Sequence, residues 1–400
     1  MRDKHVYILG KQGTGKSTLM LSMIRQDILK GKGVALIDPH GDLAESVLRY
    51  IPKSRIEDTV YFNPVVTPIG INFFTAQTEA EKLLIAGDLF LVFQRLTGGG
   101  GVRMDAILKR AIQLLLEVPG STFHDLYRMF TDNYFLHQLV ESVSDEGLRV
   151  FWKTVWPKYP HPVTEEPLVT RLSEFDSNKS LRVITSTLSS LNFSELIAKK
   201  KIFIANISKG AIGLDTSPIL GTLLVSQYQL AGFRQASLPP NRRVPCYLYI
   251  DEFHNFKTSA FNEIIIESRK FKLCLTLANQ KLDDLDQATR GTADACETVI
   301  FFRLVADDAR KFGKSIGAYG QESLMNLSDR TAIIRPGRPS DSKLFAVKAP
   351  PRPPLGFRNE IIEHVRKTYA SMAVTKRFPP AKPRGVKDDD DSVEPGLSPE

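Results

Sequence analysis

A Gly-rich run near the N-terminus carries the clearest chemistry in this sequence. Gly10-Lys-Gln-Gly-Thr-Gly-Lys-Ser17 has the spacing G-x-x-x-x-G-K-S/T. Such glycines let successive backbone N–H groups point at phosphate oxygens, while Lys16 reaches the β- and γ-phosphates and the Ser17 hydroxyl binds Mg²⁺. The run therefore predicts a site for ATP and Mg²⁺. The expected nucleotide-binding residues are Gly10, Gln12, Gly13, Thr14, Gly15, Lys16, Ser17 and Thr18.

A pair of carboxylates follows the apolar run Tyr247-Leu-Tyr-Ile250. Magnesium prefers hard oxygen ligands and keeps several waters, so Asp251 is expected to hold one of these waters opposite Ser17. Glu252 is expected to orient or deprotonate an attacking water, which makes the chemistry hydrolysis. Two carboxylates after a strand also cap helices, and it is the phosphate run that favours the catalytic interpretation.

Three further side chains are candidates for contacts with the γ-phosphate. Gln280 ends another apolar run and is expected to read the γ-phosphate or the attacking water, although it also fits a plain polar strand end. Arg269 is a candidate arginine finger that stabilises transition-state charge on a neighbouring subunit. A cation at a helix C-terminus is the alternative for Arg269. Arg303 is a second finger candidate.

The segment Asp38-Pro-His-Gly-Asp42 follows a second apolar run. In open α/β sheets ligands bind at the carboxyl ends of the strands, so Asp38 or Asp42 is a candidate neighbour of the nucleotide. A tight turn built on Pro and Gly explains the segment equally well. His40 with these two carboxylates offers too few ligands to favour a metal site.

The elements that must position these residues alternate along the chain. Strands are expected at residues 5–9, 34–37, 202–205, 246–250, 273–277 and 299–302, with helices between them, which predicts a parallel sheet covered on both faces. Residues 75–200 have helical periodicity and few strand signals, as in a helical insertion. Their aromatic residues are expected in its core, with stacking on single-stranded bases as the alternative.

Composition fits an ordinary protein with a basic body. The chain is 42% hydrophobic and 24% charged, with a formal net charge of +8, and residues 388–400 concentrate acidic side chains in the tail. A basic body suits a polyanion such as nucleic acid or a membrane surface, although a basic chain need have no such partner. The three cysteines are expected to be ordinary thiols, and no stretch predicts a membrane span.

Taken together, these motifs resemble the FtsK–HerA superfamily, most closely the conjugative coupling proteins of the TraG/TraD type. The likeness covers about residues 1–370. It rests on the phosphate run, Ile37-Asp-Pro-His-Gly-Asp42, Phe62-Asn-Pro64, Gly70-Ile-Asn72, Asn206-Ile-Ser-Lys-Gly210, Tyr247-Leu-Tyr-Ile-Asp-Glu-Phe253, Ser268-Arg-Lys-Phe271, Leu277-Ala-Asn-Gln280 and Phe302-Arg303.

This resemblance implies an α/β fold, namely a RecA-like P-loop NTPase with a parallel sheet and an inserted all-helical subdomain. It also implies a homo-oligomeric ring, usually a hexamer, that couples ATP hydrolysis to pulling DNA through a pore, with Arg269 acting in trans. The expected parts are 1–74 and 201–348 for the ATPase core, 75–200 for the helical insertion, and 349–400 for a Pro-rich extension with a disordered tail.

One departure from the family concerns the membrane. Coupling proteins usually carry transmembrane helices ahead of the phosphate loop, whereas nine residues precede Gly10 here. The expected location is therefore the cytoplasm, or the inner membrane through recruitment by a secretion or relaxosome-type partner. Two other functions stay open: an ATPase that acts on protein and not on DNA, and a small-molecule phosphotransferase, against which Glu252 argues.

Overall fold

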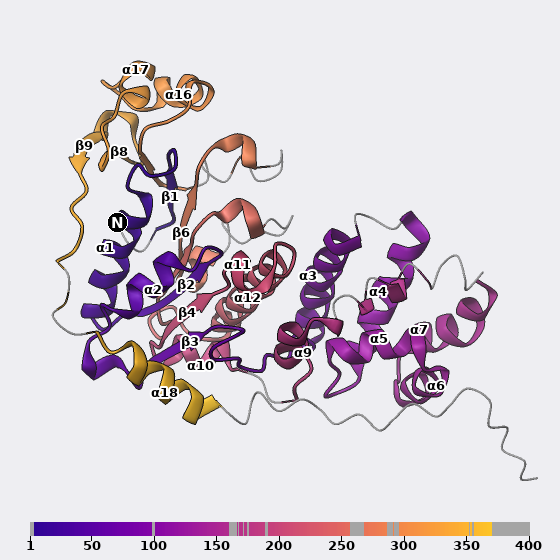
Figure 1. Ribbon diagram of the computed structural model, residues 1–400. Coiled ribbons are helices and arrows are strands. Elements are labelled where there is room, and N and C mark those ends of the chain that lie inside the picture. Colours follow the sequence, from indigo (N-terminus) through magenta and orange to yellow (C-terminus); the bar gives the residue numbers. More distant parts are fainter. Residues whose placement is uncertain are drawn as a thin grey trace, which may run out of the picture.

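The computed structural model describes residues 4–97, 101–159, 166, 168–170, 172–173, 176–188, 191–256, 268–285, 291, 296–351, 353 and 356–369. Across these residues, nine strands form one sheet in the order β3-β4-β2-β5-β6-β1-β7-β8-β9 (Figure 1). The strands are β1 (Val6–Leu9), β2 (Gly33–Asp38), β3 (Thr59–Phe62), β4 (Ile202–Asn206), β5 (Cys246–Ile250), β6 (Leu273–Asn279), β7 (Thr298–Phe301), β8 (Thr331–Pro336) and β9 (Lys343–Ala346).

Strands β1 to β7 are parallel to one another, which confirms the predicted α/β fold with a parallel sheet. Beyond β7 the sheet continues in two antiparallel strands, β8 and β9, that the sequence patterns did not predict. The short strand β3 was also missed. Strand β9 is mostly exposed, although Leu344, Phe345 and Ala346 are apolar.

Helices cover both faces of the sheet, with α1 and α2 on one face and α12 on the other (Figure 1). The helices that pack around the sheet and its edges are α1 (Lys16–Leu29), α2 (Asp42–Leu48), α10 (Phe193–Ala198), α11 (Lys209–Ile212), α12 (Thr216–Arg234), α16 (Ala306–Phe312), α17 (Gln321–Met325) and α18 (Arg358–Tyr369). Residues 216–233, which contain no charged side chain, lie in α12.

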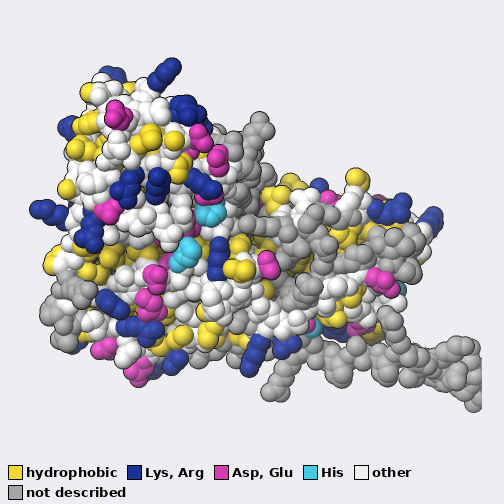
Figure 2. Space-filling model, turned by 45° about the horizontal axis from the view of Figure 1, so that its top comes forward, with side chains coloured by type: hydrophobic (Ala, Val, Ile, Leu, Met, Phe, Trp, Pro, Cys, Tyr) yellow, Lys and Arg dark blue, Asp and Glu magenta, His cyan; other side chains and the backbone are white. Residues whose placement is uncertain are grey.

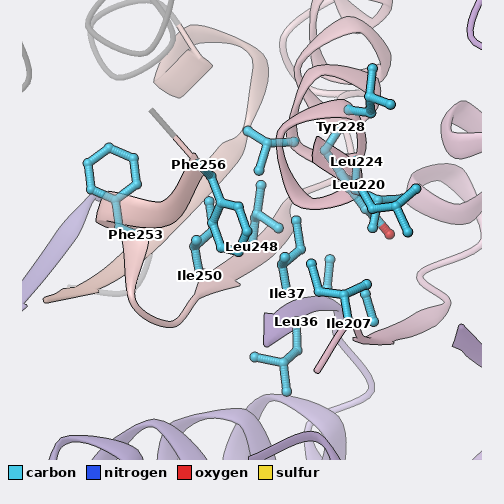
Figure 3. Close-up of a cluster of buried hydrophobic side chains, with 14 of the residues drawn as sticks. Leu36, Ile37, Ile207, Leu220, Leu224, Tyr228, Leu248, Ile250, Phe253 and Phe256 are labelled. Atoms are coloured by element: carbon cyan, nitrogen blue, oxygen red, sulfur yellow. The ribbon is translucent and has the colours of Figure 1, made fainter. Parts of the chain in front are cut away.

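The core between the sheet and α12 explains why these strands read as continuous apolar runs. Figure 3 shows Ile37 and Ile250 on the side of the sheet that carries Leu220 of α12, whereas Leu36 points the opposite way. Because successive strand residues point to opposite faces, a strand buried on both faces must be apolar at every position. Phe256 packs so closely on α12 that a Cβ added to Gly221 would lie 2.0 Å from its ring.

The remaining described helices form a separate lobe beside the sheet, next to α12 (Figure 1). They are α3 (Glu79–Thr97), α4 (Gly101–Glu117), α5 (Phe123–Thr131), α6 (Asn133–Ser142), α7 (Glu146–Val150) and α9 (Lys179–Thr185), and a π-helical turn at Phe151–Val155 follows α7. Trp152 and Trp156 are buried and pack edge-on with ring centroids 5.4 Å apart. These aromatics are therefore core residues of the lobe. The four-part division of the chain stays a prediction.

Candidate nucleotide site

The predicted phosphate loop joins the end of β1 to the start of α1. Gly15 has φ +118°, a left-handed conformation that favours glycine, and it immediately precedes the first residue of the helix. A Cβ added to Gly10 would lie 2.5 Å from the Cβ of Phe302, so only glycine fits there. The Thr14 hydroxyl donates to the Lys11 carbonyl oxygen over 2.7 Å. The loop is thus held by its own residues.

Neighbouring strands also fix the loop. The Lys11 N–H donates to the Arg303 carbonyl oxygen over 2.9 Å, and the Gly10 N–H to that of Asn279 over 3.3 Å. The Asn279 side chain accepts a bond from the His254 N–H at 3.0 Å and donates to the Tyr7 hydroxyl at 3.1 Å. One buried asparagine therefore links the phosphate loop to the segment that follows Glu252.

Lys16 lies inside the loop, and its side chain is turned onto the loop's own backbone. Its Nζ donates to the carbonyl oxygens of Gly10, at 2.7 Å, and Lys11, at 3.1 Å. Burial lowers the pKa of Lys16, while the charges of Glu252 and Asp251 act in the opposite direction. The ammonium group is thus desolvated and aimed at the space the loop encloses.

A cleft of about 600 Å³ opens beside this loop, within the usual size range of ligand sites. It is lined by Gln12, Gly13, Gly15, Lys16, Ser17, Thr18, Leu21, Asp38, His40, Asp42, Leu43, Ser46, Asp251, Glu252, Gln280 and Arg330. Every predicted nucleotide or catalytic residue other than Gly10, Thr14, Arg269 and Arg303 therefore lines one cleft. Gly10 packs against Phe302 and the Thr14 hydroxyl bonds to the Lys11 carbonyl, so both residues support the loop.

The Asp251 carboxylate is buried at the end of β5. Burial first, and then the charges of Asp38 and Glu252, raise its pKa to about 7. Its Oδ1 accepts the Glu252 N–H at 3.0 Å. A buried carboxylate in the same cleft as Ser17 suits a divalent cation, because the cation would supply the charge that this wall of the cleft lacks.

Asp38 is occupied in the turn that carries it. Its two carboxylate oxygens accept the N–H groups of His40 and Ala44, both at 2.9 Å. The turn interpretation of Asp38-Pro-His-Gly-Asp42 therefore explains Asp38, although the segment also lines the cleft. Within the described part of the chain, no three His, Cys, Asp or Glu side chains converge as a metal site.

Glu252 is held in a conformation that few non-glycine residues adopt, with φ +46°. Its Oε1 accepts the Gln280 amide at 2.9 Å, so the structure brings these two candidates together. Its Oε2 lies 3.3 Å from His254 Nδ1. Burial lowers the pKa of His254, and the charge of Glu252 opposes that shift. His254 is a neighbour that sequence reasoning missed.

The two arginine-finger candidates differ in what the structure says of them. Arg269 lies in the 3₁₀ turn Ser268–Phe271, and its side chain is outside the described part of the chain. The Arg303 guanidinium donates to Asp329 Oδ1 at 2.7 Å and to the Leu327 carbonyl oxygen at 3.3 Å. Because Arg303 is engaged within its own chain, Arg269 stays the predicted finger.

Comparisons with known proteins agree with the motifs. The family model of the helicase HerA central domain matches residues 1–83. No curated protein matches the sequence. Within the described residues, none of the helices has the length and apolar character needed to cross a membrane.

Solved structures resemble almost the whole chain. The unbound bacterial conjugative coupling protein TrwBdeltaN70 is 13% identical with a TM-score of 0.63, covering 89% of this chain and 86% of its own. TrwB in complex with ADP and Mg²⁺ is 14% identical with a TM-score of 0.62, covering 88% and 87%. VirB4 of Thermoanaerobacter pseudethanolicus is 15% identical with a TM-score of 0.61, covering 87% and 90%. The predicted resemblance and the RecA-like fold are confirmed.

Proposed function

We propose that this chain, which shares its fold with TrwB and VirB4, is an ATPase that uses Mg²⁺. It acts as one subunit of a homo-oligomeric ring and couples ATP hydrolysis to movement of DNA. The observation that carries the proposal is the single cleft shared by the phosphate loop, Asp251, Glu252 and Gln280. A phosphate cradle beside a positioned carboxylate is what hydrolysis of a terminal phosphate requires.

Each side chain has one role in this proposal. Lys16 exchanges its two carbonyl partners for the β- and γ-phosphates, and loop N–H groups cradle the phosphate chain. Ser17 and Asp251 would hold Mg²⁺, which would supply positive charge beside the phosphates. Glu252 accepts a proton from the attacking water, and Gln280 fixes the Glu252 carboxylate.

DNA is the proposed substrate because charge and likeness point the same way. The net charge of +8 becomes larger once the acidic tail is set aside. Figure 2 shows Lys and Arg side chains across the part of the molecule that contains the sheet, with acidic side chains between them. Two of the similar structures are of a conjugative or plasmid coupling protein, and the family model is of a helicase. We place the chain in the cytoplasm or at the inner membrane through a secretion or relaxosome-type partner.

A second candidate is an ATPase that acts on a protein partner. The helical lobe carries a groove of about 510 Å³ lined partly by His137, Trp152 and Trp156. Aromatic side chains beside polar ones are typical of protein interfaces. This candidate predicts hydrolysis that a protein partner stimulates and DNA does not.

The deciding experiment is the rate of ATP hydrolysis with and without single- and double-stranded DNA, alongside a mass measurement of the assembly. DNA is expected to stimulate the rate, and Lys16→Ala to abolish it. Lys30→Ala, an exposed lysine at the other end of α1, is the matched control. A ring that hydrolyses ATP but ignores DNA at every salt concentration would refute DNA as substrate. Phosphate transfer to an added small acceptor would revive the phosphotransferase.

A further inference from the structure

Arg330 lies against the phosphate loop, although no sequence motif points to it. A Cβ added to Gly15 would lie 3.2 Å from the Arg330 Cα and 3.4 Å from its Cγ. The aliphatic part of the arginine therefore packs on the last glycine of the loop, and the residue lines the same cleft as Lys16. The last motif found in the sequence ends at Arg303, so none of the motifs includes Arg330.

The backbone at Arg330 is strained and firmly held. Its φ is +59°, in the left-handed region that non-glycine residues rarely adopt. Its N–H donates to the Thr14 carbonyl oxygen at 2.8 Å, and its own carbonyl accepts the Val347 N–H at 2.7 Å. A conformation of this kind persists only where surrounding contacts fix it, and such residues cluster at functional sites.

A second set of contacts holds the turn that carries Arg330. The guanidinium of Arg303 donates to the Leu327 carbonyl oxygen and to Asp329, the residue beside Arg330. Arg303 also accepts the Lys11 N–H through its carbonyl oxygen. The Arg303–Asp329 pair thus fixes the turn in register with the phosphate loop.

The Arg330 guanidinium itself has no hydrogen-bond or ion-pair partner among the described residues, and the residue is exposed at the cleft. Among the described residues that line the cleft, Lys16 and Arg330 are the lysine and the arginine. The carboxylates in the same lining are those of Asp38, Asp42, Asp251 and Glu252. A polyphosphate entering the cleft brings further negative charge. A free guanidinium on its wall suits phosphate oxygens, which it binds through charge-assisted hydrogen bonds.

The position of Arg330 indicates which phosphates of the nucleotide it would contact. The γ-phosphate end of the cleft is marked by Glu252 and Gln280, which are bonded to each other. Gly15, on which Arg330 packs, belongs to the part of the loop that cradles the α- and β-phosphates. Arg330 is therefore placed for the phosphates that remain after hydrolysis.

We propose that Arg330 binds the α- and β-phosphates of the nucleotide held by its own chain, and that the Arg303–Asp329 pair positions it. The inference rests on the proposed nucleotide site. It gives Arg303 a role within the subunit and separates the cation that grips the nucleotide from the predicted finger Arg269, which serves the neighbouring site.

The test is calorimetric binding of ADP and of a non-hydrolysable ATP analogue, each with Mg²⁺, to the full chain and to Arg330→Gln. Loss of a charge-assisted contact is expected to weaken both ligands equally, by about tenfold or more. Arg330→Lys, which keeps the charge, should recover part of the affinity. Arg338→Gln, an exposed arginine on the turn after β8, is the control.

Asp329→Asn tests the positioning pair. It is expected to weaken ADP binding less than Arg330→Gln does, and to add nothing when combined with Arg330→Gln, because both act through one side chain.

Unchanged ADP affinity in a folded Arg330→Gln chain would overturn the inference, as would a loss confined to the ATP analogue, which would mean a γ-phosphate contact. Either result leaves the proposed function intact. A parent chain that binds neither nucleotide would instead overturn the proposed function.

Discussion

Glu252 illustrates how a single side chain is prepared for chemistry. A left-handed backbone aims it into the cleft, the Gln280 amide fixes one carboxylate oxygen, and the other oxygen faces His254. Among the described residues this second oxygen has no hydrogen-bond partner, although it is buried. A buried acceptor left open at the end of a strand is placed to accept a proton from water.

We expect Glu252→Gln to lower kcat by about a hundredfold or more, because the amide cannot accept a proton. The affinity for ADP should stay unchanged, since the isosteric amide keeps the shape of the site. Steady-state hydrolysis and calorimetric binding measure the two quantities, with the exposed Glu322→Gln as control. A variant that hydrolyses ATP at the parent rate would exclude Glu252 as the base.

The sequence could identify those residues whose local spacing forms a recognisable motif. Gly10–Ser17, the Asp251–Glu252 pair and Gln280 each end or follow a strand, so their meeting at one edge follows from a parallel sheet. Asn279 and Arg330 could not be found this way. Their places depend on how β1, β6 and β8 line up, which no short window of sequence contains.

At the scale of elements, α12 shows how closely a helix can approach the 3₁₀ turn Phe253–Phe256 that follows β5. Gly221 leaves room for the Phe256 ring, which packs where a side chain would otherwise lie. Glycine weakens a helix interior, so its presence in a buried helix has a packing reason here.

Gly221→Ala is expected to destabilise the fold by about 1–3 kcal/mol, because the added methyl must displace the Phe256 ring. Gly87 of α3 has no atom within 4 Å of an added Cβ, so Gly87→Ala should stabilise by up to about 1 kcal/mol. Urea unfolding of both variants compares these opposite effects. Equal shifts in one direction would refute the packing explanation.

The contact between α3 and α12 contains a carboxyl group that titrates high. Burial raises the pKa of Asp88 to about 6, with a hydrogen bond to Ser226 acting in the opposite direction. Ionising Asp88 therefore costs the folded state more than the unfolded one. The penalty is absent below about pH 4, grows as pH rises towards 6, and is complete above that.

Asp88→Asn should accordingly raise the melting temperature at pH 8 by more than it does at pH 4. Thermal melts of parent and variant at both pH values measure the difference. A gain of equal size at the two pH values would assign the effect to packing and not to charge.

Periodicity predicted most elements near the core but not the edge of the sheet. Within residues 75–200, where helical periodicity was predicted, lie α3 and α4, and apolar runs located the buried strands except β3. Strands β8 and β9 were missed although both contain apolar residues, and β8 also contains Arg335 and Pro336. Pairing with β7, rather than composition, makes β8 a strand.

For the whole molecule, the main question is what completes the site. Arg303 is held by Asp329 and, in our proposal, Arg330 grips the nucleotide of its own chain. With both guanidinium groups engaged in their own chain, neither Arg303 nor Arg330 is available to reach a neighbouring subunit. Arg269 therefore stays the predicted finger of the proposed ring.

Arg269→Ala should reduce hydrolysis by about a thousandfold in the assembled protein. Mixing variant with parent chains should lower the activity of the parent chains too, because some parent sites then face a neighbour without its finger. Hydrolysis per chain should also rise with protein concentration as the assembly forms. Mixtures whose activity is simply the sum of their parts would refute action in trans.

The two bonds from Lys16 to its own loop have a consequence for turnover. The buried ammonium group is satisfied by the carbonyl oxygens of Gly10 and Lys11. Departure of the spent nucleotide then leaves no stranded charge, because the lysine returns to a resting position inside the loop. In the proposed cycle of ATP hydrolysis, product release therefore does not leave the lysine without hydrogen-bond partners.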